Sequence, residues 1–220
     1  KKINSNDLLV SSKHFLLHKE ERTSVIKPLA IESNEGTGSM GDDTALAVMS
    51  KMHRQIYDYF RQQFAQVTNP PIDSLREASV MSLETCYGPE LNVFDETPDH
   101  AKRLVTTSPV LSFKKLQAII KNKHFESIEI NLEYSSKSSL KKSLIKLQND
   151  IVKQVKKGKV IIHLVEKLPS STKLPINALL AVGCVHQKLV ELGLRSDANI
   201  VISSSSARDT HQIACLIGFG

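Results

Sequence analysis

The side chains that could hold a metal fall into two sparse groups. His14 and His18 lie one helical turn apart, as in a helical metal site, but no Glu follows His14 as it does in the zinc-protease motif. Cys86, Cys184 and Cys215 are widely spaced and form no C-x-x-C pair. The residues therefore predict no metal centre, and two partly exposed helix positions are the favoured interpretation of the histidines.

Two polar segments could hold an anion. The first, GTGSMG at 36–41, has no preceding strand or Gly-Lys-Ser/Thr ending, and Asp42 and Asp43 would repel a phosphate. It is typical of a tight turn before a helix capped by one of those aspartates. The second, SSSS at 203–206, lies between a strand and a helix, where α/β proteins often bind ligands. A solvated loop containing a helix cap is the alternative, and it is favoured.

Nucleophilic catalysis finds little support. Cys184 and Cys215 lie in apolar helical runs typical of a core, whereas Cys86 is nearer a surface turn. The spacing does not pair any histidine with a carboxylate and a nucleophile, so no catalytic residue is predicted.

Composition indicates a globular protein. The chain has 220 residues, of which 40% are apolar and 24% charged, enough for a hydrophobic core. No apolar run reaches the roughly 18 residues that span a bilayer, and the first residues lack a signal-peptide core. We therefore expect a soluble, cytoplasmic protein in a reducing compartment, without a membrane partner. Both chain ends look like cuts from a larger protein.

The formal net charge of +6 raises the possibility of nucleic-acid binding. Most of the excess lies between residues 99 and 159. There, apolar residues at 140, 144, 147, 151 and 155 follow helical spacing, and the lysines fall mostly elsewhere on the helix. A solvated helix face explains this pattern, and no aromatic stacking platform accompanies it, so no nucleic-acid partner is predicted.

Three regions differ in their patterning. Residues 1–37 form an irregular lobe with a short helix expected at 7–20. Residues 38–107 are predicted to be helical, with helices beginning at 45, covering 55–66 and running from 74 to about 86. Asn69-Pro70-Pro71 must interrupt the helix before it, because proline lacks a backbone donor and restricts its neighbour.

Residues 108–220 alternate in period. Strands are expected at 128–132, 160–165 and 198–202, and each is followed by a helix, at about 140–157, 175–192 and 207–217. Such a βαβαβα run predicts parallel strands joined by right-handed crossovers. The predicted fold class is therefore α/β: a helical, irregular N-terminal part followed by a parallel-sheet unit that resembles an incomplete barrel.

An ordered series of motifs resembles the central domain of glutamate synthase. It comprises GSMGDDTALAV at 38–48, FAQVTNPPID at 64–73, VMSLET at 80–85, PINALLAV at 175–182, GLR at 193–195 and ARD at 207–209. The resemblance covers most of the chain and is more specific than any single motif above.

The resemblance implies a parent that hydrolyses glutamine, passes ammonia through an internal tunnel, and makes glutamate from 2-oxoglutarate with reduced FMN. It implies an amidotransferase domain before this one and an FMN-binding barrel with an iron–sulfur cluster after it. Some members also use a small NADPH-oxidising subunit. No cofactor is expected in this chain itself. Its implied role is to scaffold the two catalytic domains and to form part of the tunnel wall, without catalysis of its own.

By resemblance, Met40, Thr68 and Asn69 match the tunnel-lining segment. An apolar thioether with neutral hydroxyl and amide groups suits a path for neutral ammonia, although ordinary loop packing explains the same residues. The chain departs from the family at 203–206, usually acidic Glu-Ser-Gly-Glu, and at 165–167, often Ser-Asp-Arg, where it has Val-Glu-Lys. The alternative function is an autonomous α/β module that binds a phosphorylated metabolite through the serine loop.

Overall fold

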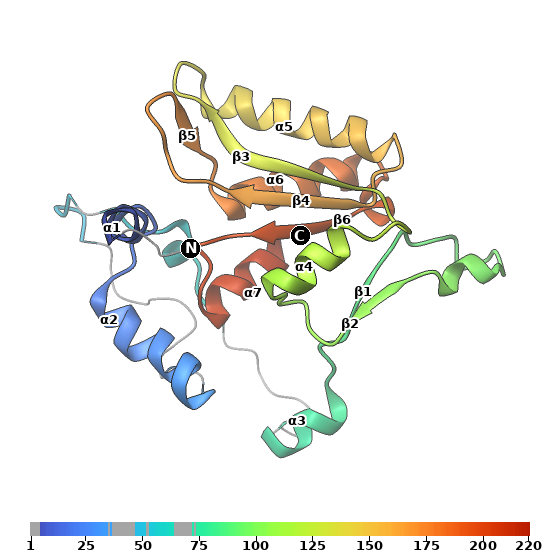
Figure 1. Ribbon diagram of the computed structural model, residues 1–220, viewed down its shortest axis with the longest axis horizontal. Helices are drawn as coiled ribbons and strands as arrows, with labels where there is room; N and C mark the ends of the chain where they lie inside the picture. The colour runs from blue at the N-terminus through green and yellow to red at the C-terminus, as the bar shows by residue number, and fades with distance from the viewer. Residues whose placement is uncertain (1–4, 35, 37–46, 52, 64–71, 73) are drawn as a thin grey trace.

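The computed structural model describes residues 5–34, 36, 47–51, 53–63, 72 and 74–220. Its centre is a four-stranded sheet in the order β5-β3-β4-β6 (Figure 1). The parallel strands are β3 (Ser127–Ser135), β4 (Ile161–Glu166) and β6 (Asn199–Ser203), and β5 (Lys173–Pro175) adds an antiparallel edge to β3. The predicted α/β class and the incomplete barrel are confirmed.

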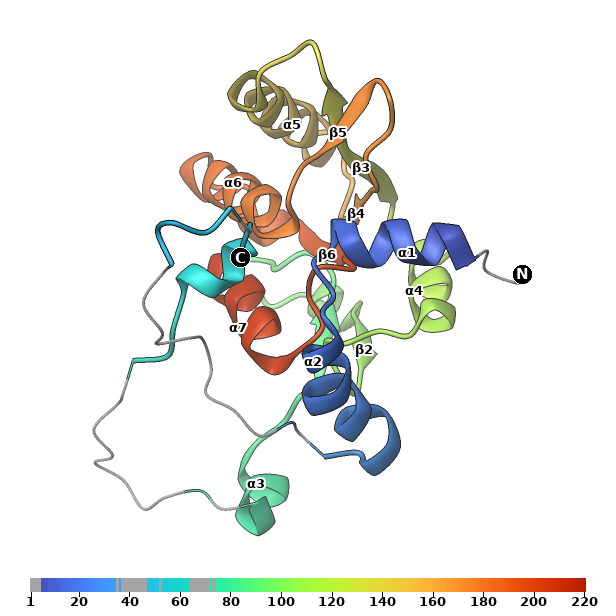
Figure 2. The ribbon, with the colours of Figure 1, turned by 90° about the vertical axis from the view of Figure 1, so that its left-hand side faces the viewer.

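One face of this half-barrel is covered by three helices. α5 (Leu140–Val155), α6 (Ala178–Glu191) and α7 (Thr210–Phe219) each follow a parallel strand and pack side by side (Figure 2). Alternate strand residues, including Leu132, Ile162 and Leu164, point into this helix-covered core and are fully buried. The successive crossovers therefore keep to the same side of the sheet, as they do in a barrel.

Local sequence explains where these helices begin and end. The side chains of Ser139, Asn177 and Asp209 accept a hydrogen bond from the first turn of α5, α6 and α7, respectively. After α5 the chain reverses at Gly158, whose φ of 90° suits glycine. The lysines of α5 are exposed while Leu147, Ile151 and Val155 are buried, so the predicted amphipathic helix is confirmed.

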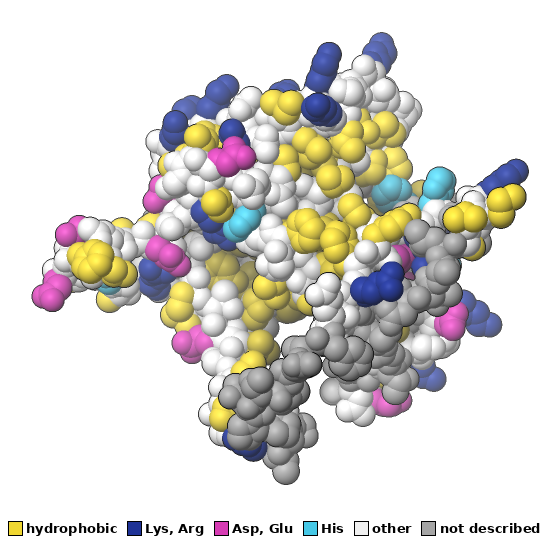
Figure 3. All heavy atoms as spheres, turned by 180° about the vertical axis from the view of Figure 1, so that it is seen from behind, with side chains coloured by type: hydrophobic (Ala, Val, Ile, Leu, Met, Phe, Trp, Pro, Cys, Tyr) yellow, Lys and Arg dark blue, Asp and Glu magenta, His cyan; other side chains and the backbone are white. Residues whose placement is uncertain are grey.

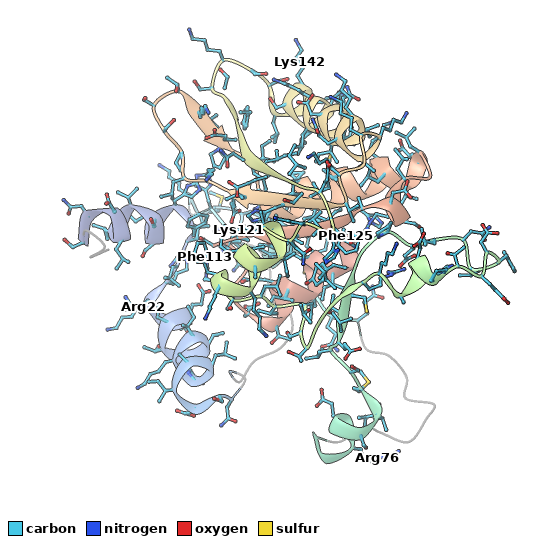
Figure 4. All side chains as sticks on the ribbon, turned by 45° about the vertical axis from the view of Figure 1, so that its right-hand side comes forward. Arg22, Arg76, Phe113, Lys121, Phe125 and Lys142 are labelled. Atoms are coloured by element: carbon cyan, nitrogen blue, oxygen red, sulfur yellow. The ribbon has the colours of Figure 1, made fainter. Side chains whose placement is uncertain are left out.

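The opposite face of the sheet is partly covered by elements that the sequence did not predict. They are the antiparallel pair β1 (Thr85–Tyr87) and β2 (Leu104–Thr106) and the helix α4 (Phe113–Ile120). A 3-10 turn, Pro98–Ala101, lies in the connection between the two strands, away from the sheet (Figure 1). Tyr87, Ile119 and Ile161 form a second small core there, against which Phe125 packs. Figure 4 shows Phe113 at the start of α4 and Phe125 nearer the sheet.

The N-terminal lobe is a broken helical segment. α1 (Ser5–His14) ends before Leu16, whose φ of 52° interrupts the predicted helix at 7–20. α2 (Lys19–Glu21) then continues into π-helical turns, Arg22–Ile26 and Pro28–Glu32. The helix expected at 7–20 is therefore two helices with a corner between them.

Three further expectations for the second region are wrong. Of the helix at 55–66, the described part contains only a 3-10 turn, Ile56–Tyr59, followed by extended backbone at Phe60, because Tyr57 is fully buried against the half-barrel. Residues 47–50 form a turn rather than part of a helix. α3 (Ser74–Val80) ends early because residues 85–87 pair with β2.

Two helices of the third region also begin later than predicted. α6 begins at Ala178 and not at Pro175, since Pro175 still belongs to β5 and Asn177 caps the helix. α7 begins at Thr210 after the cap at Asp209. None of the described helices is both long and apolar enough to cross a membrane. The proposed divisions at residues 37 and 107 stay predictions.

Candidate functional site

The residues predicted to line the tunnel, Met40, Thr68 and Asn69, lie outside the described residues, as does most of the glycine-rich segment at 36–41. The half-barrel edge at the carboxyl ends of β4 and β6 is described, and it contains the serine loop. In an α/β fold this edge is the usual place for a ligand. This edge is therefore the candidate site.

The serine loop surrounds a carboxylate of the chain itself. Oε2 of Glu166, the last residue of β4, accepts hydrogen bonds from the Ser204 hydroxyl at 2.8 Å and from the backbone N–H groups of Ser205 at 3.0 Å and Ser206 at 3.1 Å. Oε1 accepts from the Ser206 hydroxyl at 2.9 Å and, at 3.4 Å, from the N–H of Ala178. Consecutive N–H groups aimed at one oxygen are an anion-binding arrangement, and here Glu166 is the anion.

This geometry argues against the metabolite-binding alternative. The hydroxyl and N–H donors that a phosphate would need are already bonded to Glu166. The Ser204 hydroxyl oxygen also accepts from the N–H groups of Ser206 and Ala207, so it caps its own loop. The serine loop is a structural joint between the ends of β4 and β6 and the start of α6.

Tyr57 extends this joint to the second region. Its ring is fully buried, and its hydroxyl lies 3.4 Å from the Ser206 hydroxyl. Its carbonyl oxygen accepts a hydrogen bond from Nε2 of His211 on α7 at 3.0 Å. Burial is the main cause that raises the pKa of the Tyr57 phenol, so this group stays neutral and bridges two regions.

Arg208 ties the N-terminal lobe to the same edge. Its Nε and Nη2 donate to the two carboxylate oxygens of Glu21 at 2.7 and 2.9 Å, and its Nη1 donates to the carbonyls of Phe15 at 3.1 Å and Ser205 at 2.8 Å. Both charged side chains are mostly buried, at 13% and 17% exposure. Such a bidentate pair fixes orientation as well as distance. We call Arg208, Glu21 and the Phe15 carbonyl the lobe clamp.

The sequence pointed to some of these residues but not to the contacts between them. Glu166 attracted attention only as a departure from the family pattern, and Arg208 only as part of the ARD motif. Glu21 and Tyr57 were not singled out. A carboxylate ending an apolar strand, next to a loop rich in donors, is the one local signal that would have indicated the joint.

The described residues do not suit the cofactors that the family implies. No three His, Cys, Asp or Glu side chains of this part of the chain converge on one point, and an iron–sulfur cluster needs several thiolates together. Burial raises the pKa of the Cys184 and Cys215 thiols, and Cys86 is exposed on β1. The serine-loop donors that are bonded to Glu166 are not free for a flavin phosphate. The corner at Leu16 separates His14, the last residue of α1, from His18, which has extended backbone just before α2.

The half-barrel, whose carboxyl edge holds the Glu166 carboxylate and is tied to a preceding lobe, defines an α/β domain. The chain belongs to the glutamate synthase central domain family, whose model, described as "Glutamate synthase central domain", matches residues 11–220. The resemblance inferred from the motifs is therefore confirmed.

Several named relatives support this assignment. The chain is 37% identical over 224 residues to ferredoxin-dependent glutamate synthase 2, chloroplastic, of Arabidopsis thaliana, covering 99% of this chain and 14% of that protein. The figures for the spinach (Spinacia oleracea) ferredoxin-dependent enzyme are 37% over 226 residues, with the same coverages. Glutamate synthase [NADH] of Saccharomyces cerevisiae is 33% identical over 211 residues, covering 91% of this chain and 10% of the relative. The chain thus spans about 14% of the length of the first relatives.

Proposed function

We propose that this chain is the connecting domain of a glutamate synthase: it scaffolds an amidotransferase domain and an FMN-binding domain and lines the ammonia path between them. The family match over residues 11–220 carries the proposal. The parent would be an oxidoreductase that makes glutamate from glutamine and 2-oxoglutarate. The chain would contribute no catalytic residue to that reaction.

Exposed apolar side chains support a scaffolding role. On α1, Leu8, Leu9 and Val10 are more than half exposed. Across the molecule, Ile217 of α7 is 65% exposed, and Figure 3 shows apolar side chains gathered on the face seen from behind, where α5–α7 lie. Side chains of this size favour cover by another protein surface. Two such faces on opposite sides suit a domain placed between others.

The tunnel assignment of Met40, Thr68 and Asn69 belongs to this proposal. Neutral ammonia passes a lining of thioether, hydroxyl and amide groups without being trapped as ammonium by a carboxylate. The family match, which includes these positions, supports the assignment.

Replacing Thr68 by Phe in the full-length parent tests the tunnel. Glutamine hydrolysis should continue while glutamine-dependent glutamate formation falls, because the enlarged side chain would obstruct ammonia. The matched control is Thr172→Phe, since Thr172 is exposed in the loop before β5. Both rates are measured on one preparation, and rates that remain matched in Thr68→Phe would sink the tunnel assignment.

The cofactors belong elsewhere in the parent in this proposal. FMN and the iron–sulfur cluster would be bound by the following domain, and electrons would come from ferredoxin or a nicotinamide nucleotide, as the relatives' names indicate for those proteins. A cytoplasmic location is part of the same proposal. The purified 220-residue chain should show no flavin absorption after incubation with FMN, and a stoichiometric yellow complex would contradict the proposal.

A further inference from the structure

One buried imidazole takes no part in the joint or the lobe clamp. His163 lies in the middle of β4, on the sheet face opposite α5–α7, and is only 4% exposed. A polar ring in an otherwise apolar strand needs partners, because burying it unpaired costs free energy. A neighbour on β6 supplies one partner, and a carboxylate on β3 approaches the other ring nitrogen.

The two neighbours are a serine and a carboxylate. Nε2 of His163 lies 2.8 Å from the hydroxyl oxygen of Ser203, at the carboxyl end of β6. Nδ1 lies 3.2 Å from Oε2 of Glu129, which is directly opposite His163 in the β3–β4 register. Nδ1 has no hydrogen-bond partner in the described residues, so this approach is close but not aligned. The Glu129 side chain is 52% exposed and is free to rotate into line.

Electrostatics favour a neutral imidazole in this position. Burial, the largest cause, lowers the pKa of His163 below its usual 6.5, and Lys167 acts in the same direction, while the Glu129 carboxylate opposes both. The negative charge beside Nδ1 favours the tautomer with its proton on Nδ1. Nε2 then has its lone pair directed at the Ser203 hydroxyl, which is the arrangement of a general base and a nucleophile.

We propose that Ser203 is an activated nucleophile for small activated acyl esters, with His163 as its general base and Glu129 as a positioning residue. The Ser203 oxygen attacks the ester carbonyl while His163 takes the hydroxyl proton and passes it to the departing alcohol. Water then attacks the acyl-serine carbonyl while His163 accepts the water proton; the ester bond to Ser203 breaks, His163 returns the proton to the Ser203 oxygen, and the carboxylic acid is released. No oxidant, metal or co-reactant is needed.

Access is compatible with this chemistry. Ser203 is partly exposed and the Glu129 side chain is 52% exposed, so a small ester can approach Ser203 where β1, β2 and α4 leave this face of the sheet uncovered. The loop that follows Ser203 is held by Glu166, which keeps the nucleophile's backbone in place. Its neighbour Ser205 is exposed, and no hydrogen bond joins its hydroxyl to a described histidine, so it serves as an internal control.

The test is covalent labelling of the full-length parent with a small alkyl fluorophosphonate. The serine oxygen bonds to phosphorus, fluoride leaves, and the adduct is located by peptide mass spectrometry. Ser203 should be labelled at least about 100-fold faster than Ser205, and His163→Gln should remove that advantage, because a general base contributes about 10²–10⁴-fold. Ser203→Ala should abolish the adduct.

The pH profile separates a chemical role from a structural one. Labelling of Ser203 should rise with pH and level off near or below pH 6.5, as His163 loses its proton. Glu129→Gln should slow labelling about tenfold and move the midpoint downward, because the carboxylate that raises the pKa is gone. Equal rates at Ser203 and Ser205, no adduct, or a rate unaffected by His163→Gln would each overturn the proposal. The comparison of Ser203 with Ser205 uses only the unmutated protein, so it decides the proposal even if a variant misfolds.

Discussion

Glu166 accepts hydrogen bonds from two separate segments of the chain. These segments are the loop at 204–206 and the first turn of α6, and the two carboxylate oxygens tie both to the end of β4. Ser206, one of its donors, is only 5% exposed, so water cannot easily replace the carboxylate. A buried donor that loses its acceptor bears the full cost of desolvation.

We predict that Glu166→Gln destabilises the chain by about 2–4 kcal/mol, because an amide offers one acceptor oxygen and turns an NH₂ group toward donors. The measurement is urea unfolding followed by circular dichroism. Glu133→Gln is the matched control: Glu133 pairs with the half-exposed Lys173, and that change should cost about 1 kcal/mol or less. Equal losses in the two variants would mean that Glu166 is not the joint.

His163 should make the chain less stable at mildly acidic pH. Burial holds the pKa of His163 below 6.5 in the folded chain. Just below pH 6.5 the imidazole is therefore neutral in the folded chain but binds a proton in the unfolded chain. The free energy of unfolding should therefore fall as pH drops below about 6.5, and level off below the folded pKa. His163→Gln should flatten this slope relative to the unmutated chain. The pKa of His186 is also lowered, first by burial and then by Arg195, so His186→Gln is measured in parallel.

At the scale of elements, the lobe clamp decides where the N-terminal helices sit. α1 and α2 bury no residue of their own, so apolar packing within them does not fix their position. Arg208 reaches from the start of α7 to Glu21 and to the Phe15 carbonyl, and Gln55 donates to that same carbonyl at 2.7 Å. The lobe is held mainly by polar contacts with directional geometry.

A double-mutant cycle of Arg208→Ala and Glu21→Ala should give a coupling energy of about 1–3 kcal/mol, since the pair is bidentate and mostly buried. Both single variants should also speed amide hydrogen exchange in residues 5–32. The control cycle uses Lys188 and Glu191, an exposed pair one turn apart on α6, for which about 0.5 kcal/mol or less is expected. A coupling no larger than the control's would show that the clamp does not hold the lobe.

Strong periodicity explains which elements could be predicted. α5 and the parallel strands follow patterns of apolar residues that persist over several turns or alternations, and the structure confirms them. The helix expected at 55–66 fails in its described part because Tyr57 gains more from burial in the half-barrel than its neighbours gain from helical bonds. β1 and β2 are three residues each and carry too little pattern to be recognised.

At the scale of the whole molecule, exposed apolar residues distinguish a docking face from a core. Leu9 on α1 is 54% exposed, whereas Leu189 on α6 is fully buried. The two residues are chemically identical, so their substitutions separate assembly from folding. A scaffold domain needs exposed apolar residues such as Leu9, because the neighbouring domains bury them on assembly.

Leu9→Ser should change the stability of the isolated chain by about 0.5 kcal/mol or less, yet lower the glutamine-dependent activity of the parent. Leu189→Ser should instead destabilise the isolated chain by about 3 kcal/mol or more, by leaving a cavity and a buried hydroxyl. Unfolding midpoints and parent activity are measured for both. An unaffected parent activity in Leu9→Ser would exclude α1 as a docking face.

The amino-acid sequence by itself determined the βα alternation, the amphipathic face of α5 and the family, because each depends on neighbours or on an ordered series of motifs. Tertiary structure alone decided that Glu166 occupies the serine loop, that Arg208 holds Glu21, and that His163 meets Ser203. These pairs are separated by 38 to 40 residues or, for Arg208 and Glu21, by 187. No local periodicity predicts contacts over such sequence separations, because strand register and crossover handedness bring the partners together only when the sheet has formed.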